Sequence, residues 1–189
     1  MAARKIMQGW LLVGLLAGGC ASWRSGPLDL AGRKADPLSE TNGVATVLIF
    51  VSNDCPISNR YAPEIRRLEA AFGPRGVRFW MVHADPRETA AEITEHDRQF
   101  DLRIPALRDT DHFLMRLSHA EVTPTAAIFT PGRKLVYHGR IDDRVTDLQR
   151  ERPEPTQRDL AEALEAVLSG KTVPTLETPA FGCFIPKLR

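Results

Sequence analysis

The sequence predicts an α/β sandwich, in which a central mixed sheet is flanked by helices, and three segments carry this prediction. Residues 44–51 form a continuous apolar, β-branched run, as expected of a central strand covered on both faces. From Cys55 to Phe72 the apolar residues recur every three or four positions, which is typical of one helix face. Residues 77–84 are expected to form a second strand, which Asp85-Pro86 closes. Strand, helix and strand therefore alternate, as in α/β folds.

The remainder of the chain continues this alternation with shorter elements. The dipeptide Pro131-Gly132 predicts a hairpin, and Gly170 stands just past the end of the last expected helix. The tail, residues 171–189, contains three prolines and is expected to be irregular. In chain order we expect a helix within 87–101, an extended piece at 104–107, a short helix at 111–119, strands at 126–130 and 134–138, and a helix at 157–168.

Residues 1–20 have the layout of a secretory signal. Arg4 and Lys5 precede the apolar residues 10–17, and two glycines then lead to Cys20. The apolar stretch is shorter than the roughly 20 residues that a membrane-spanning helix needs. A cysteine directly after small residues resembles the bacterial lipoprotein signal, in which that cysteine carries the lipid. The alternatives are plain cleavage nearby and an uncleaved N-terminal tether.

The sequence therefore predicts four segments and a cellular location. Residues 1–20 are the signal segment and residues 21–43, rich in Gly, Ser, Pro and Asp, are a linker. Residues 44–170 form the domain, and residues 171–189 the tail. We expect an exported protein of the cell envelope or periplasm that is anchored to the membrane through lipid on Cys20.

Composition excludes several classes of function. The 189 residues are 43% hydrophobic and 26% charged, as expected of one globular domain. With 25 Lys and Arg against 24 Asp and Glu, the net charge is +1, so no nucleic-acid partner is expected. No glycine-rich phosphate loop or Ser-His-Asp arrangement stands out, and we expect no cofactor. No metal site is expected either, since the five histidines are scattered without paired ligand spacing: His83, His96, His112, His119 and His138.

Cys55 is the candidate reactive residue, because it lies where the first strand ends and the helix begins. The unpaired N–H groups of a helix start present positive potential, which favours a thiolate. Pro56 suits the first helical position, where no N–H is needed. The alternative is a small buried core cysteine. The polar residues 52–54 make that alternative the weaker one, and we expect an accessible, easily ionised sulfur.

These features together resemble the thioredoxin superfamily. An apolar strand is followed by Cys55-Pro56 at a helix start and by Pro63 eight positions further on, and Val122-Thr-Pro-Thr125 precedes the hairpin. Within the superfamily the chain is most similar to the redoxin branch, the alkyl hydroperoxide reductase/thiol-specific antioxidant (AhpC/TSA) type, over residues 40–170. Residues 137–142 are similar to those of exported members.

The resemblance implies a thioredoxin-like three-layer sandwich and assigns supporting roles near the cysteine. The loop with Thr123 and Pro124 resembles the one whose cis-proline faces the active cysteine, where it offers strand-like pairing to a bound peptide or to the tail. An ordinary turn proline is the alternative. Ser58 either hydrogen-bonds the Cys55 thiolate or caps the helix turn.

Two departures from the family pattern bear on the chemistry. Dithiol members have a second cysteine where this chain has Ser58, so Cys55 cannot close the usual four-residue disulfide. Peroxidase members carry Pro-x-x-x-Thr/Ser-x-x-Cys. Here Ser52 fits that motif, but Leu48 replaces the proline, which weakens the case for a peroxidase.

Cys183 is the expected partner thiol, because two thiols remain if Cys20 carries lipid. It lies on the Pro-rich tail, which can fold back over the site. Cys183 then resolves a mixed disulfide formed by Cys55. The alternatives are a permanent structural disulfide, and a Cys183 that is free or paired with another chain.

Three functions follow from these residues. The first is an exported thiol-disulfide oxidoreductase with Cys55 as nucleophile and Cys183 as resolving thiol, acting on protein thiols or disulfides with an unknown reductant. The second is a thiol peroxidase, in which a small peroxide oxidises Cys55 to a sulfenic acid. The third is a non-enzymatic, lipid-tethered module that binds a partner or delivers copper.

Overall fold

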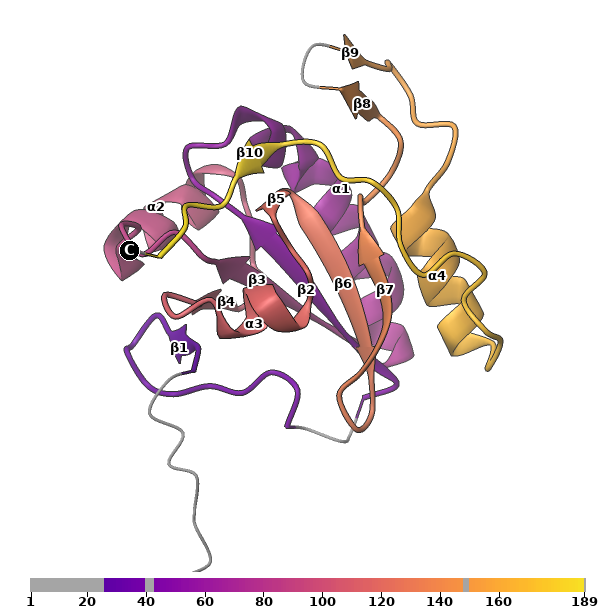
Figure 1. Cartoon of the computed structure of the whole chain (residues 1–189), viewed down its shortest axis with the longest axis horizontal. Helices are drawn as coiled ribbons and strands as arrows, with labels where there is room; N and C mark the ends of the chain where they lie inside the picture. The colour runs from indigo at the N-terminus through magenta and orange to yellow at the C-terminus, as the bar shows by residue number, and fades with distance from the viewer. Residues whose placement is uncertain (1–25, 40–42, 148–149, 189) are drawn as a thin grey trace, which may run out of the picture.

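A six-stranded mixed sheet forms the centre of the molecule (Figure 1). The computed structural model describes residues 26–39, 43–147 and 150–188. The strand order is β1-β4-β3-β2-β6-β7, with β2, β3 and β4 parallel and the other pairs antiparallel. The predicted α/β sandwich with a mixed sheet is thus confirmed. The strands are β1 Leu28–Asp29, β2 Ala45–Val51, β3 Val77–His83, β4 Ala106–Arg108, β6 Thr125–Thr130 and β7 Lys134–Gly139.

Helices cover both faces of this sheet. Apolar residues of α1, α2 and α4 join one core cluster, and Leu114 of α3 lies in the second cluster on the opposite face. Figure 1 looks onto the face that α3 covers, with α1 behind the strands. The helices are α1 Pro56–Phe72, the 3₁₀ turn η1 Gly73–Arg75, α2 Ala90–Gln99, α3 Phe113–Leu117 and α4 Asp159–Leu168.

The central strand and its helix form where the pattern predicts them. All seven residues of β2 are buried, which explains its unbroken apolar run. Cys55 is the N-cap of α1, with extended backbone (φ −87°, ψ 106°), and Pro56 occupies the first helical position. α2 begins with a capping box in which Thr89 and Glu92 satisfy each other's backbone N–H groups.

The segments outside residues 44–170 are more ordered than the sequence suggests. β1 lies within the expected linker and pairs with β4, and Leu38 is buried in the core. In the tail, β10 (Cys183–Phe184) pairs with β5 (Val122–Thr123). Strands of two residues are too short for alternation to be read from the sequence.

The turn after β7 also differs from expectation. The adjacent charged residues Asp142, Asp143 and Arg144 predict a solvated turn, but both aspartates are buried, so this prediction is wrong. Asp142 accepts hydrogen bonds from the Tyr61 hydroxyl at 2.7 Å and from the Arg144 N–H at 2.9 Å. Asp143 accepts hydrogen bonds from the Thr156 N–H and hydroxyl and from the Gln157 N–H. A hairpin of β8 (Val145–Asp147) and β9 (Arg150–Glu151) follows.

The N-terminal signal and Cys20 lie outside the described residues. Within the described ranges, no helix combines the length and the apolar character that crossing a bilayer requires.

Truncation of Leu68 tests the α1–sheet core. This residue is fully buried, so Leu68→Ala is expected to lower the free energy of unfolding by about 2–5 kcal/mol. Urea denaturation followed by circular dichroism measures the loss. The matched variant Glu69→Ala, on the exposed side of the same helix, should change stability by less than about 0.5 kcal/mol. Equal losses in the two variants would contradict this packing.

Candidate functional site

The Cys55 sulfur lies at the junction between β2 and α1, as predicted. A turn carries the chain from the strand to the helix, and the Cys55 N–H donates to the Ser52 carbonyl at 3.2 Å. The Ser58 N–H points back along the first helical turn and donates to the Cys55 Sγ at 3.4 Å. The helix start thus directs a backbone donor at the sulfur, which is the electrostatic setting that stabilises a thiolate.

The loop before β6 covers the sulfur from the other side. The Thr123–Pro124 peptide bond is cis, as the resemblance implied. The Thr123 carbonyl accepts a hydrogen bond from the Cys55 Sγ–H at 3.1 Å. Residues 68 positions apart in the sequence therefore meet at the sulfur.

The tail folds back over this loop and brings the second thiol to the first, as the sequence suggested it can. Cys183 in β10 pairs with Thr123 in β5, and the Ile185 N–H donates to the Glu121 carbonyl at 2.9 Å. Figure 1 shows the yellow tail passing over the end of β5. Cys55 and Cys183 line one hollow of about 140 Å³, and both are free thiols.

A glycine permits this close approach of the tail. A Cβ atom on Gly182 would lie 1.9 Å from the Thr123 carbonyl oxygen, a distance that no side chain tolerates. The tail consequently leaves Cys55 only 1% exposed, whereas Cys183 is half-buried and Phe184 is 81% exposed. The expectation of an accessible Cys55 is therefore wrong for this arrangement, because the tail itself covers the sulfur.

The two thiols have opposite electrostatic environments. Burial raises the pKa of Cys55, but hydrogen bonding of the Cys183, Thr123 and Ser58 side chains and of the Ser58 N–H to the thiolate outweighs burial and holds that pKa below its ordinary value. Burial, together with the hydrogen bond to Cys55 and the charge of its thiolate, raises the pKa of Cys183 to about 11. At neutral pH, Cys55 is thus the thiol that ionises more readily and Cys183 the one that keeps its proton.

The Ser58 hydroxyl is placed to donate a hydrogen bond to the Cys55 thiolate. Its Oγ is buried and has no hydrogen-bond partner among the described residues, and its side chain is one of the groups that lower the pKa of Cys55. A buried hydroxyl without a partner is costly, and donation to a charged sulfur removes that cost. Of the two roles expected for Ser58, this favours the bond to the thiolate.

Ser52 and Pro56, two further expected site residues, flank Cys55 in the chain and make no hydrogen bond to its sulfur in the described structure. Pro56 is exposed at the first turn of α1, and Leu48 is buried in β2. Ser52 donates its hydroxyl to Glu88 at 2.8 Å rather than to Cys55. Sequence reasoning missed Glu88, because a single carboxylate in a loop after a strand carries no motif; only its burial distinguishes it.

The histidines do not assemble a metal centre in the described part of the chain, where no three His, Cys, Asp or Glu residues are grouped suitably for one. His119 and His138 approach each other with ring centroids 5.3 Å apart. His83 pairs with Glu88 instead.

The pH dependence of alkylation tests the electrostatics of this site. Only the thiolate reacts, so the lowered pKa of Cys55 means that its alkylation rate should reach its plateau at lower pH than in the urea-unfolded chain. Ser58→Ala removes a donor to the charged form and should move the midpoint to higher pH. Mass mapping of the Cys55 peptide after iodoacetamide treatment gives the rates.

Ser118→Ala is the matched control, because Ser118 also carries a buried hydroxyl that has no partner in the described part of the chain, and it is not among the groups that shift the pKa of Cys55. It should leave the midpoint unchanged. A folded-state midpoint at or above that of the unfolded chain would contradict the proposed environment.

Comparison with solved structures agrees with this fold. A crystal structure of an uncharacterized conserved protein from Geobacillus kaustophilus is 25% identical, with a TM-score of 0.73 over 87% of this chain and 88% of that one. A hypothetical protein, SMc02350, from Sinorhizobium meliloti 1021 is 25% identical, with a TM-score of 0.72 over 84% of this chain and 87% of that one.

A secreted Mycobacterium tuberculosis disulfide oxidoreductase shares the fold at 17% identity, with a TM-score of 0.51 over 76% of this chain and 92% of that one. No functionally curated protein matches the sequence. Residues 28–138, more than half of the chain, match the AhpC/TSA family. The chain therefore belongs to the AhpC/TSA family, with a thioredoxin-like fold.

Proposed function

We propose that the protein is a thiol-disulfide oxidoreductase in which Cys55 is the nucleophile and Cys183 the resolving thiol. The observation that carries this proposal is the pairing of β10 with β5, which holds Cys183 opposite Thr123, the residue whose carbonyl contacts the Cys55 sulfur. Two free thiols with oppositely shifted pKa values share one hollow there. That is the arrangement that stepwise disulfide exchange requires.

The reaction has two exchange steps. The Cys55 thiolate attacks one sulfur of a partner disulfide, forms a mixed disulfide and releases the other partner sulfur as a thiolate. Cys183 then attacks the Cys55 sulfur, forms the Cys55–Cys183 disulfide and releases the second partner thiolate, which takes up the Cys183 proton. Two electrons pass to the partner, and a dithiol reductant restores both cysteines by the reverse exchange.

The order of these steps follows from the charge on Cys55. While Cys55 is a thiolate, its charge and its hydrogen bond keep Cys183 protonated. Formation of the mixed disulfide removes both influences and leaves only burial to raise the pKa of Cys183. Cys183 therefore becomes a better nucleophile at the moment when it has a disulfide to resolve.

The burial of Cys55 favours a second candidate, a thiol peroxidase. A hollow of about 140 Å³ beneath the tail suits a small peroxide better than a protein segment. The Cys55 thiolate would attack the peroxide O–O bond, yielding a sulfenic acid and, with one proton, an alcohol or water. Cys183 would then condense with the sulfenic acid and release water. Leu48, in place of the family proline, weighs against this chemistry.

Export is part of the proposal and rests on the sequence. The basic, apolar and small residues that lead to Cys20 support secretion and lipid attachment. In an oxidising compartment a closed Cys55–Cys183 pair persists until a reductant opens it.

Thiol trapping with mass mapping tests the proposed pair. In the wild type, a Cys55–Cys183 link should form with oxidised glutathione and open with dithiothreitol under native conditions. Cys183→Ser should accumulate a Cys55–glutathione mixed disulfide, because the resolving thiol is missing, whereas Cys55→Ser should react at least about tenfold more slowly.

A link that resists dithiothreitol in the folded protein would instead identify a structural disulfide, and absence of the link would exclude Cys183 as the resolving thiol. Hydrogen peroxide as the oxidant separates the two candidates: consumption that depends on Cys55 at catalytic turnover supports the peroxidase.

Release of the tail should expose Cys55. Gly182→Ala forces a Cβ atom into the Thr123 carbonyl, so β10 should detach and alkylation of Cys55 at high pH should accelerate at least about tenfold. Lys187→Ala, an exposed change in the same tail, should not alter the rate. An unchanged rate in Gly182→Ala would show that the tail does not limit access.

A further inference from the structure

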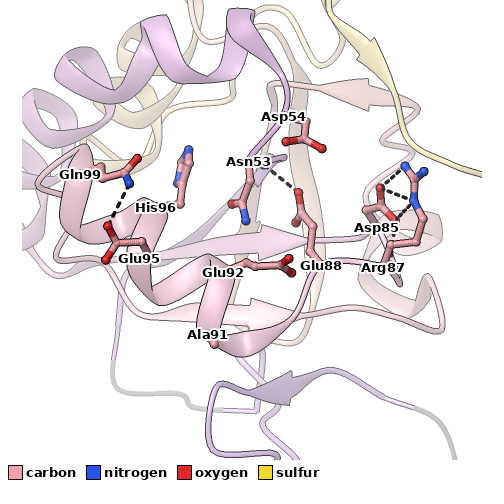
Figure 2. A pocket seen from close by; sticks show the side chains of 10 residues that line it. All are labelled: Asn53, Asp54, Asp85, Arg87, Glu88, Ala91, Glu92, Glu95, His96 and Gln99. Carbon is pink, nitrogen blue, oxygen red and sulfur yellow. Dashed lines mark hydrogen bonds and ion pairs between the residues drawn. The ribbon is translucent and has the colours of Figure 1, made fainter.

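A polar cleft of about 650 Å³ lies beside the site, and the carboxylates that line it differ in exposure. Glu92 caps the start of α2 and Glu95 pairs with Arg98, and the side chains of both are exposed. Glu88 also lines the cleft but is only 8% exposed. Figure 2 shows its carboxylate reaching from the loop after β3 towards Asn53.

The Glu88 carboxylate holds the turn that precedes Cys55. One oxygen, Oε1, accepts from the Ser52 hydroxyl at 2.8 Å and from the Asn53 N–H at 2.7 Å. The other oxygen, Oε2, is bonded to the Nδ1 atom of His83 at 2.7 Å. His83 is fully buried at the end of β3, so the carboxylate joins β3 to the strand-to-helix turn.

The charge state of this group follows from its partners. Burial raises the pKa of Glu88, but the bonds from His83, Asn53 and Ser52 and the attraction of His83 outweigh it and keep that pKa below its ordinary value. An ionised carboxylate can only accept hydrogen bonds, so the His83 Nδ1–H donates to it. A buried carboxylate is stable only with such full pairing.

The opposite side of the turn is held as well. The Asn53 carbonyl accepts from the Asn59 side-chain amide at 3.0 Å, and the Asn59 Oδ1 contacts the His96 Nε2 at 2.8 Å. Both backbone polar groups of Asn53 are therefore fixed two residues before Cys55. Without Glu88, the Asn53 N–H and the Ser52 hydroxyl lose their acceptor. Only the hydrogen bond from Asn59 to the Asn53 carbonyl then holds the turn.

We propose that Glu88 is a positioning residue for Cys55: by fixing Ser52 and Asn53, it sets the sulfur in line with the Ser58 donor and the Thr123 loop. It acts through the turn and touches neither the sulfur nor a substrate. The inference deepens the proposed function, because it presumes that the reactivity of Cys55 matters, but positioning can be measured without any turnover.

The test compares three substitutions by the pH dependence of Cys55 alkylation in the full chain. Glu88→Ala removes the acceptor, and Glu88→Asp keeps the charge but shortens the reach. Both should move the midpoint to higher pH and slow alkylation at neutral pH about tenfold, because the thiolate loses its aligned donors. Glu88→Gln retains an oxygen for Ser52 and Asn53, so it should restore the rate to within about twofold of wild type.

Glu95→Gln is the matched control, since it removes a carboxylate from the same cleft without touching the turn, and it should behave as wild type. If Glu88→Ala does not fold, the alkylation midpoint of Glu88→Asp decides the outcome. Wild-type midpoints in Glu88→Asp or Glu88→Ala would overturn the proposal. Equal impairment in Glu88→Gln would also overturn it, because charge rather than position would then be responsible. If the protein shows no disulfide exchange but the alkylation midpoints of the Glu88 variants are as expected, only the proposed function is contradicted.

Discussion

The antiparallel pairing of β10 with β5 is the interaction on which the site depends. It covers the Cys55 sulfur, places Cys183 in the same hollow and requires a glycine at position 182, where the two backbones meet. Without this pairing the chain would present a single cysteine at a helix start. With it, the tail brings a second thiol to the hollow that Cys55 lines.

The same pairing links ionisation to access. Cys55 is stabilised as a thiolate by donors that the fold fixes around it, yet the tail that supplies one of these donors also excludes solvent from it. The hollow that Cys55 and Cys183 line has a volume of about 140 Å³, and the tail residues beside it are the half-buried Cys183 and the exposed Phe184. Motion of the tail, rather than of the sheet, is therefore the change that would alter substrate range.

Much of this fold was predictable from local patterns, and the site was predictable in part. The buried run of β2 and the helix start at Cys55 follow from periodicity and proline chemistry, which are local properties. The cis peptide bond at Thr123–Pro124 was expected only from the resemblance to the thioredoxin superfamily. The expected accessibility of Cys55 was wrong, since burial by a tail is a long-range effect. The burial of Glu88 and Asp142 could not be predicted from the sequence. An acidic residue is expected at the surface unless its hydrogen-bond partners are known, and here these partners are distant in the sequence.

A redox titration shows whether Cys55 and Cys183 form an exchangeable pair. Equilibration of the folded protein in dithiothreitol buffers of graded potential gives the fraction of linked thiols. We predict one two-electron transition between about −120 and −270 mV, the range of catalytic dithiols. A midpoint below about −300 mV, typical of structural disulfides, or the lack of a Cys55–Cys183 transition, would contradict the account.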